Sequence, residues 1–188
     1  MSSTRQRWLD EGLTVLAEEG EAGLRIDRLA SRLGLTKGSF FHHFDGAPGY
    51  RAALLAEYER LTLGALADAI GARHGSDTRD TLAWLTELAT SRPESLRRPA
   101  LDLAVRAWAA SDPDARATQA RIDAAVIDAL QAAWRPAVES DEAARAAALV
   151  PYLVSLGAAM TVPPVSPDEL RRVYELLLDA VPGDSPSR

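Results

Sequence analysis

The sequence predicts an all-α fold of about nine helices, and three observations support this fold class. No stretch alternates apolar and polar residues over the length of a strand, and no Asn-Gly pair marks a tight hairpin. Apolar residues instead recur at intervals of three and four along most of the chain. Glycine, proline, serine and aspartate stand at the ends of these stretches, where helices begin and end.

Residues 1–48 are expected to form a domain of three short helices. The first helix ends near Gly20, and Gly34 is placed to end the second. Thr36 precedes the third helix, which runs from Lys37 to about residue 44, and its hydroxyl is suited to cap it. The inward-facing residues of the three helices are Trp8, Leu9, Leu13, Leu16, Ile26, Leu29, Ala30, Leu33, Phe40 and Phe44.

Residues 49–182 are expected to form a second, larger helical domain, followed by a disordered tail at 183–188. A long helix should follow the break at 45–49, and another should start at "SDTRD" (76–80). A third should follow Pro99. Further helices should begin after the caps Asp112 and Ser166, and one should span about 141–160. Ser166 and Glu169 fit a capping box, and this last helix should end at Val181.

Charge is distributed unevenly. The chain carries a net charge of −6, which argues against a generally basic nucleic-acid-binding surface. Between residues 25 and 43, however, four basic residues stand against one acidic residue, which leaves −9 for the remainder. The basic residues are Arg25, Arg28, Arg32 and Lys37, and the acidic one is Asp27. A small basic surface on an acidic body fits nucleic-acid binding confined to one module.

The expected location is the cytoplasm, without a membrane contact. Cysteine is absent, which excludes disulfides and thiolate chemistry, and the N-terminus lacks the apolar core of a signal peptide. Residues 146–167 carry no charge, but Pro151, Pro163 and Pro164 interrupt the stretch, and a spanning helix needs roughly 20 apolar residues. We therefore expect a helix buried on most sides within protein.

The segment "LTKGSFFHHF" (35–44) carries the functional prediction. A short helix, a turn at Gly34–Thr36 and a second short helix form a helix-turn-helix, whose second helix enters the DNA major groove. Gly38 costs helix stability of about 1 kcal/mol, a cost that fits close approach of the backbone to DNA. His42 and His43 point about 100° apart on a helix, which disfavours a shared metal ion. No metal or cofactor is expected.

The segment "RIDRLASRLGLTKGSFFHHF" (25–44) resembles the DNA-binding region of the TetR family of transcriptional regulators. The resemblance rests on Leu29-Ala30, on the turn Gly34-Leu35-Thr36 and on the ending at 41–44. The resemblance implies that Thr36 caps the helix and touches a phosphate, and that Lys37, Ser39 and His42 reach base edges or the DNA backbone. It also implies that Phe41 lies against a sugar or a thymine methyl group and that His43 orients the helix.

Three positions depart from the family pattern. The family usually has a tyrosine at Phe41 and a lysine at Ala47, each of which contacts a phosphate, and a capping threonine at Arg25. Two phosphate contacts are therefore expected to be missing, with Arg25 as a substitute. The predicted DNA-contacting residues are Arg25, Thr36, Lys37, Gly38, Ser39, Phe41, His42 and His43.

The larger domain is expected to bind a small-molecule effector and to form a homodimer. The resemblance favours a ligand site near Trp84, Arg106 and Trp108, although core packing is the default role of each tryptophan. The last two helices carry apolar residues beyond a single stripe, so they have more apolar surface than packing within one domain requires. We interpret the excess as a dimer interface, and the alternative interpretation is a wide core within one chain. The predicted dimer residues are Leu149, Tyr152, Leu153, Leu156, Met160, Leu170, Tyr174, Leu177 and Leu178.

Together these features predict a homodimeric, ligand-responsive DNA-binding regulator, more specifically a repressor that a small molecule releases from a double-stranded operator. One alternative is an enzyme on a helical bundle, but the sequence has no metal-ligand spacing, nucleophile elbow or glycine-rich phosphate loop. The other is a helical adaptor that keeps a degenerate helix-turn-helix and binds protein.

Overall fold

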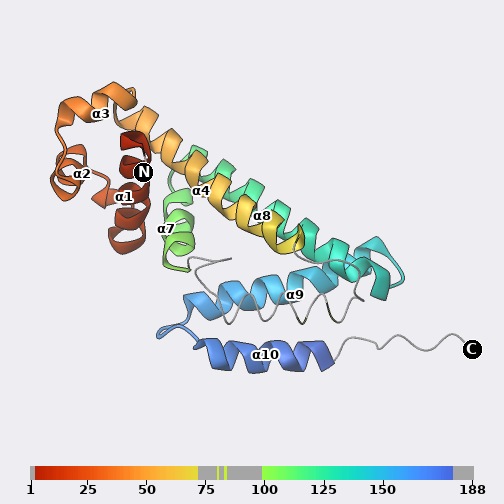
Figure 1. The fold of residues 1–188 in the computed structure, drawn as a ribbon. Helices are drawn as coiled ribbons and strands as arrows, with labels where there is room; N and C mark the ends of the chain where they lie inside the picture. The colour runs from red at the N-terminus through yellow and green to blue at the C-terminus, as the bar shows by residue number, and fades with distance from the viewer. Residues whose placement is uncertain (1–2, 72–79, 81–82, 84–98, 180–188) are drawn as a thin grey trace, which may run out of the picture. The chain divides into compact units, whose positions relative to one another are not determined.

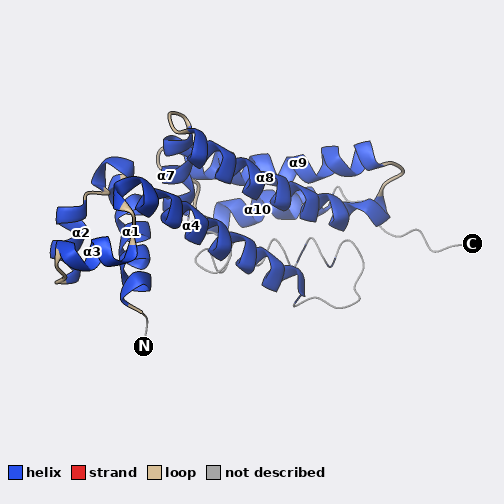
Figure 2. Ribbon diagram, turned by 90° about the horizontal axis from the view of Figure 1, so that it is seen from above, coloured by secondary structure: helices blue, strands red, loops and turns tan. Residues whose placement is uncertain are grey.

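The computed structural model describes residues 3–71, 80, 83 and 99–179, and within them the fold is all-α (Figure 1). This part of the chain holds eight α-helices, two short 3₁₀ turns and no strand (Figure 2). The predicted fold class is confirmed. The helix predicted to start at 76–80 lies almost wholly outside the described residues. The helices are α1 (Thr4–Glu19), α2 (Ile26–Leu33), α3 (Lys37–His43), α4 (Gly46–Gly71), α7 (Pro99–Ala109), α8 (Pro113–Trp134), α9 (Asp141–Met160) and α10 (Pro167–Asp179), with the 3₁₀ turns at Glu21–Gly23 and Arg135–Ala137.

The chain divides into two compact units. One comprises Met1–Thr62 and Pro99–Ile122, and the other comprises Leu63–Arg98 and Asp123–Arg188. Helices α4 and α8 each contribute residues to both units. Helix α4 begins at Gly46, earlier than the sequence predicts, and includes Pro48 in its first turn. Proline is tolerated there because the N–H groups of the first helical turn have no acceptor within the helix.

Side chains cap the helices where the sequence predicts caps. The hydroxyl of Thr36 accepts a hydrogen bond from the N–H of Ser39 at 3.2 Å. Asp112 Oδ1 accepts from the N–H groups of Asp114 and Ala115, each at 2.9 Å. Ser166 and Glu169 form the predicted capping box in both directions (3.2 and 3.3 Å). Each cap satisfies N–H groups that the first helical turn leaves without acceptors.

Gly34 sets the turn between α2 and α3. Its φ of +64° is left-handed, a conformation that strains residues with a Cβ. The N–H of Gly34 bonds to the carbonyl of Ser31 (3.2 Å), and the N–H of Leu35 bonds to that of Ala30 (2.9 Å). This glycine-based ending stops α2 and directs the chain into α3.

The core of the first unit is aromatic. Phe40 has no exposed surface, and its ring contacts Trp8, Phe44 and Tyr50 with centroids 5.2–5.3 Å apart. The Tyr50 hydroxyl donates a 2.7 Å hydrogen bond to the carbonyl of Trp8. Gly12 lies so close to Tyr50 that no side chain fits between α1 and α4 at this point. Helix α7 also packs against α1 within this unit.

Helices α9 and α10 pack against each other in the second unit. Tyr174 of α10 is buried, and its hydroxyl donates to the carbonyl of Pro151 in α9 at 3.1 Å. The expectation that α9 is buried on most sides is wrong for the single chain, because only 17% of its most apolar 18-residue window is buried. By length and composition α9 is also the one helix among the described residues that meets the criteria for crossing a membrane.

Candidate DNA interface

Helix α3 is anchored by one face and exposed on the other. Phe40 and Phe44, spaced i, i+4, are buried, as the sequence predicts. Lys37, Gly38 and His42 are exposed. Phe41 is 60% exposed, an unusual state for a phenylalanine. An exposed large apolar side chain between polar ones suits contact with a surface that is itself part apolar, such as the sugars and methyl groups of DNA.

The remaining predicted contact residues flank this face. Thr36 is exposed at the start of α3, and Ser39 is half-buried, with its N–H donating to the Thr36 hydroxyl. His43 is half-buried, with its ring 5.0 Å from the ring of His42 and 6.3 Å from that of Phe44. His43 therefore packs against the anchoring residue, whereas His42 projects outward.

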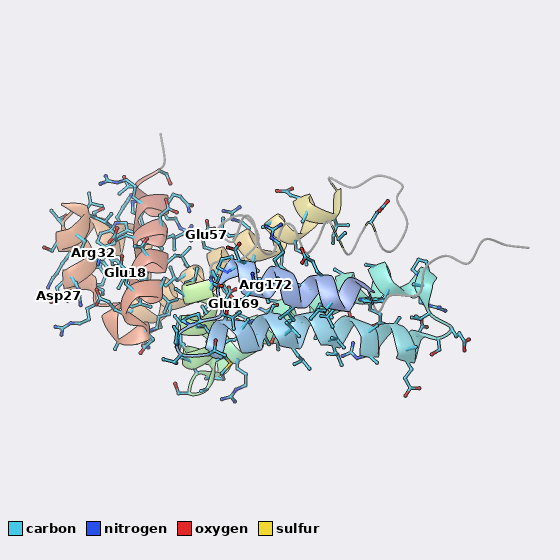
Figure 3. The ribbon with its side chains drawn as sticks, turned by 90° about the horizontal axis from the view of Figure 1, so that it is seen from below. Glu18, Asp27, Arg32, Glu57, Glu169 and Arg172 are labelled. Atoms are coloured by element: carbon cyan, nitrogen blue, oxygen red, sulfur yellow. The ribbon has the colours of Figure 1, made fainter. Side chains whose placement is uncertain are left out.

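Two of the four basic residues counted in the sequence are occupied by carboxylates of α1. Arg32 forms ion pairs with Glu11 and Glu18, the latter at 3.1 Å (Figure 3). The hydrogen bonds that Arg32 donates to Glu18 and Glu11 raise the pKa of its guanidinium. Arg28 Nη2 donates to Glu19 at 2.6 Å. The basic surface is consequently smaller than the local excess of +3 suggests, because α1 neutralises most of it.

Arg25 and Lys37 keep their charge accessible. Arg25 occupies the N-cap position of α2 in extended conformation and makes no side-chain capping hydrogen bond. Its guanidinium lies 3.5 Å from Asp27, and the side chain is 71% exposed. Solvent screens a pair this exposed, so it does not prevent Arg25 from turning toward a phosphate.

The predicted loss of a phosphate contact concerns Ala47, at the start of α4, and stays a prediction. Ala47 is exposed in the first turn of α4, where N–H groups and the helix dipole favour an anion. The residues from Gly46 to Tyr50 carry no charge, and Asp45 just before them is acidic.

Two of the three predicted ligand residues, Arg106 and Trp108, lie in the described part of the chain. Trp84 lies outside the described residues. Arg106 is half-buried and Trp108 is buried, both on α7 in the first unit. Two residues apart on a helix, they point about 200° from each other and do not share a face.

The predicted dimer residues are partly exposed in the single chain. Leu153 and Met160 are 58% and 67% exposed, whereas Tyr174 is buried between α9 and α10. The side chain of Leu178 lies outside the described part. The half-buried members are Leu149, Tyr152, Leu156, Leu170 and Leu177. The list of predicted dimer residues omits four further exposed apolar residues of this region, Val150, Val162, Val173 and Leu176.

Residues 9–46 match the model of the bacterial regulatory proteins of the tetR family. The similarity to the tetR family is therefore shown for this N-terminal segment. The match runs from the middle of α1 through α2 and α3, the two helices of the helix-turn-helix, and it confirms the predicted resemblance. No curated protein matches the sequence.

Solved structures share the fold over almost the whole chain. Reduced NemR of E. coli superimposes with a TM-score of 0.80 at 18% identity, covering 97% of this chain and 100% of its own. A TetR transcriptional regulator from Legionella pneumophila gives 0.78 at 11% identity, with 97% and 99% covered. The multidrug binding protein EbrR, complexed with imidazole, gives 0.61 at 21% identity, with 99% of each chain covered. At these low identities the superpositions show that the fold is shared over almost the whole chain.

Proposed function

We propose that the protein is a homodimeric, ligand-responsive DNA-binding transcriptional regulator whose α3 enters the major groove. The observation that carries the proposal is the two-sided character of α3. Phe40 and Phe44 fix one side in an aromatic core, and Lys37, Phe41 and His42 stand exposed on the other. A seven-residue helix with this support matches the recognition element of a helix-turn-helix.

The proposed assembly pairs α9 and α10 with their copies in a second chain. Leu153, Met160 and Leu176 are each more than half exposed, and α9 is largely uncovered in the single chain. A second copy covers these apolar residues and supplies the second recognition helix that a quasi-palindromic operator requires. The boundary near residue 48 between the DNA-binding and the larger domain is part of the same proposal.

The proposed effector is a small molecule that binds in the larger domain and releases the operator. The complex of EbrR with imidazole supports a ligand site in this fold. A ligand changes DNA affinity only to the extent that it binds the two conformations differently, and a coupling of about 1–3 kcal/mol is typical. Such a regulator works where the chromosome lies, in the cytoplasm of a bacterium, and the proposal assigns it no catalytic role.

A gel shift with the DNA upstream of the protein's own gene tests the DNA-binding function. The parent protein should retard this DNA, and the double variant Lys37→Ala, His42→Ala should not. Arg135→Ala is the matched control, since it removes one positive charge from an exposed ion pair with Asp141 outside the TetR-type domain and should bind as the parent does. Absence of any shift by the parent at low salt would favour the protein-binding adaptor instead.

A further inference from the structure

Arg5, in the first turn of α1, lies at the end of the recognition helix. Its guanidinium carbon is 5.4 Å from the centroid of the Phe44 ring, and Phe44 is the residue that caps α3. The ring itself is held in place, because it is 6% exposed and contacts Phe40 and Tyr50. Arg5 and Phe44, almost forty positions apart in the sequence, are thus in contact at the corner between α3 and α4.

This contact orients the guanidinium without using its hydrogen-bond donors. Arginine stacks on an aromatic face through its plane, which leaves the N–H groups at its edge available for a phosphate. Arg5 is exposed, and none of the ion pairs among the described residues includes it. The positive charge of Arg5 contributes to the lowered pKa of Glu57, but the Glu57 carboxylate already forms an ion pair with Arg60 at 2.6 Å.

The position of Arg5 complements that of Lys37. Lys37 is the first residue of α3, and Arg5 stands at Phe44, just after its last residue. Seven residues of α-helix extend about 10 Å, close to the roughly 12 Å width of the major groove, which phosphates border on both sides. The two cationic residues therefore belong to opposite ends of the helix, Lys37 at its first residue and Arg5 beside its C-cap.

The α3–α4 corner otherwise lacks positive charge. From Asp45 to Tyr50 the chain has no basic residue, and Asp45 itself is exposed and repels a phosphate. We propose that Arg5, whose guanidinium carbon lies over the Phe44 ring, binds the DNA phosphate backbone at the end of α3. The proposal rests on the DNA-binding function proposed above, and it adds a contact residue from outside the helix-turn-helix itself.

Salt dependence of binding to the upstream DNA, measured by fluorescence anisotropy, tests the proposal. Arg5→Ala should flatten the slope of log affinity against log salt by about 0.9, the contribution of one neutralised phosphate. At low salt the affinity should fall about tenfold. Arg5→Lys should keep the slope, because it keeps the charge, and should lose a smaller part of the affinity.

Arg7→Ala is the matched control. It removes the same charge from the same helix, but Arg7 donates a 3.2 Å hydrogen bond to the carbonyl of Leu33 and does not lie on Phe44. Its slope should equal that of the parent, and the melting temperature of Arg5→Ala should equal that of the parent, because an exposed stack contributes little stability. If the parent binds DNA and Arg5→Ala binds with the same salt slope as the parent, the proposed role of Arg5 is wrong and the proposed function stands. If the parent binds no DNA, both the proposed function and the contact of Arg5 are wrong.

Discussion

Replacing Gly12 by alanine should destabilise the TetR-type domain, although alanine is the better helix former. A Cβ at this position lies 2.0 Å from the Tyr50 hydroxyl oxygen and 2.9 Å from Leu54 Cδ1. Tyr50 cannot swing away, because it is 2% exposed and its ring lies 5.2 Å from Phe40 and 4.9 Å from Phe44. The clash therefore has to be relieved by moving α1 away from α4.

The magnitude follows from three contributions. Overpacking a filled core costs about 1–3 kcal/mol. Loss of the hydrogen bond from Tyr50 to the Trp8 carbonyl costs about 1 kcal/mol more, and the helix propensity of alanine returns about 1 kcal/mol. A net loss of about 1–3 kcal/mol should lower the melting temperature by about 2–4 °C for each kcal/mol in a chain of this size.

Thermal unfolding followed by circular dichroism measures this effect, and Tyr50→Phe should rescue it. Removing the hydroxyl relieves the shortest contact, so the double variant should be less destabilised than the sum of the single variants by at least about 1 kcal/mol. Gly38→Ala is the control, because its Cβ meets nothing closer than 3.7 Å and should raise the stability. A Gly12→Ala protein as stable as the parent would refute the packing described for α1 and α4.

Three further predictions concern charge. Ala47→Lys should steepen the salt slope of DNA binding by about 0.9, and an unchanged slope would contradict the placement of the first turn of α4 beside a phosphate. Glu18→Gln should raise DNA affinity at low salt in the same assay, since it frees Arg32 in part; equal or weaker affinity would count against the neutralising role of α1. Hydrogen bonds from Arg60 lower the pKa of Glu57, so the stability it contributes is present above the ordinary carboxyl pKa and lost as the pH falls through the lowered value. Urea unfolding should therefore show Glu57→Gln to be less stable than the parent at neutral pH, with the gap closing in acid, and a constant gap would exclude this ionisation.

Local signals predicted the helix-turn-helix well. The ends of α1, α2 and α3 follow from Gly20, Gly34 and Thr36, because glycine and threonine act through the backbone of their own turns. The same holds for the caps Asp112 and Ser166. Burial of Phe40 and Phe44 follows from their i, i+4 spacing alone.

Contacts between distant segments were not predictable in this way. The count of basic residues between positions 25 and 43 was correct, but it did not show that α1 neutralises Arg28 and Arg32. The spacing of Glu11 and Glu18, seven residues apart on one helical face, was the only available signal. The contact of Arg5 with Phe44 depends on how α1 packs on α3, which no local pattern encodes.

The surface of α9 illustrates a different limit. The apolar composition of α9 predicts that its surface is covered. Composition does not say whether the same chain, a second copy of the chain or another apolar environment covers that surface. Half of the predicted dimer residues are partly covered by their own chain, and Tyr174 is fully so. The exposed remainder includes Leu153, Met160 and Leu176, and these three are the most direct targets for mutation of the proposed interface.

Selection of bound duplexes from a random DNA pool tests the central claim most directly. Two copies of α3, presented by a symmetric dimer, should enrich inverted repeats whose half-sites lie about 10 base pairs apart or a multiple of that distance. Inserting about half a helical turn between the half-sites should abolish binding, because the two recognition helices then face opposite sides of the duplex. Enrichment of no sequence, or of single half-sites that bind as tightly as the repeat, would contradict the claim.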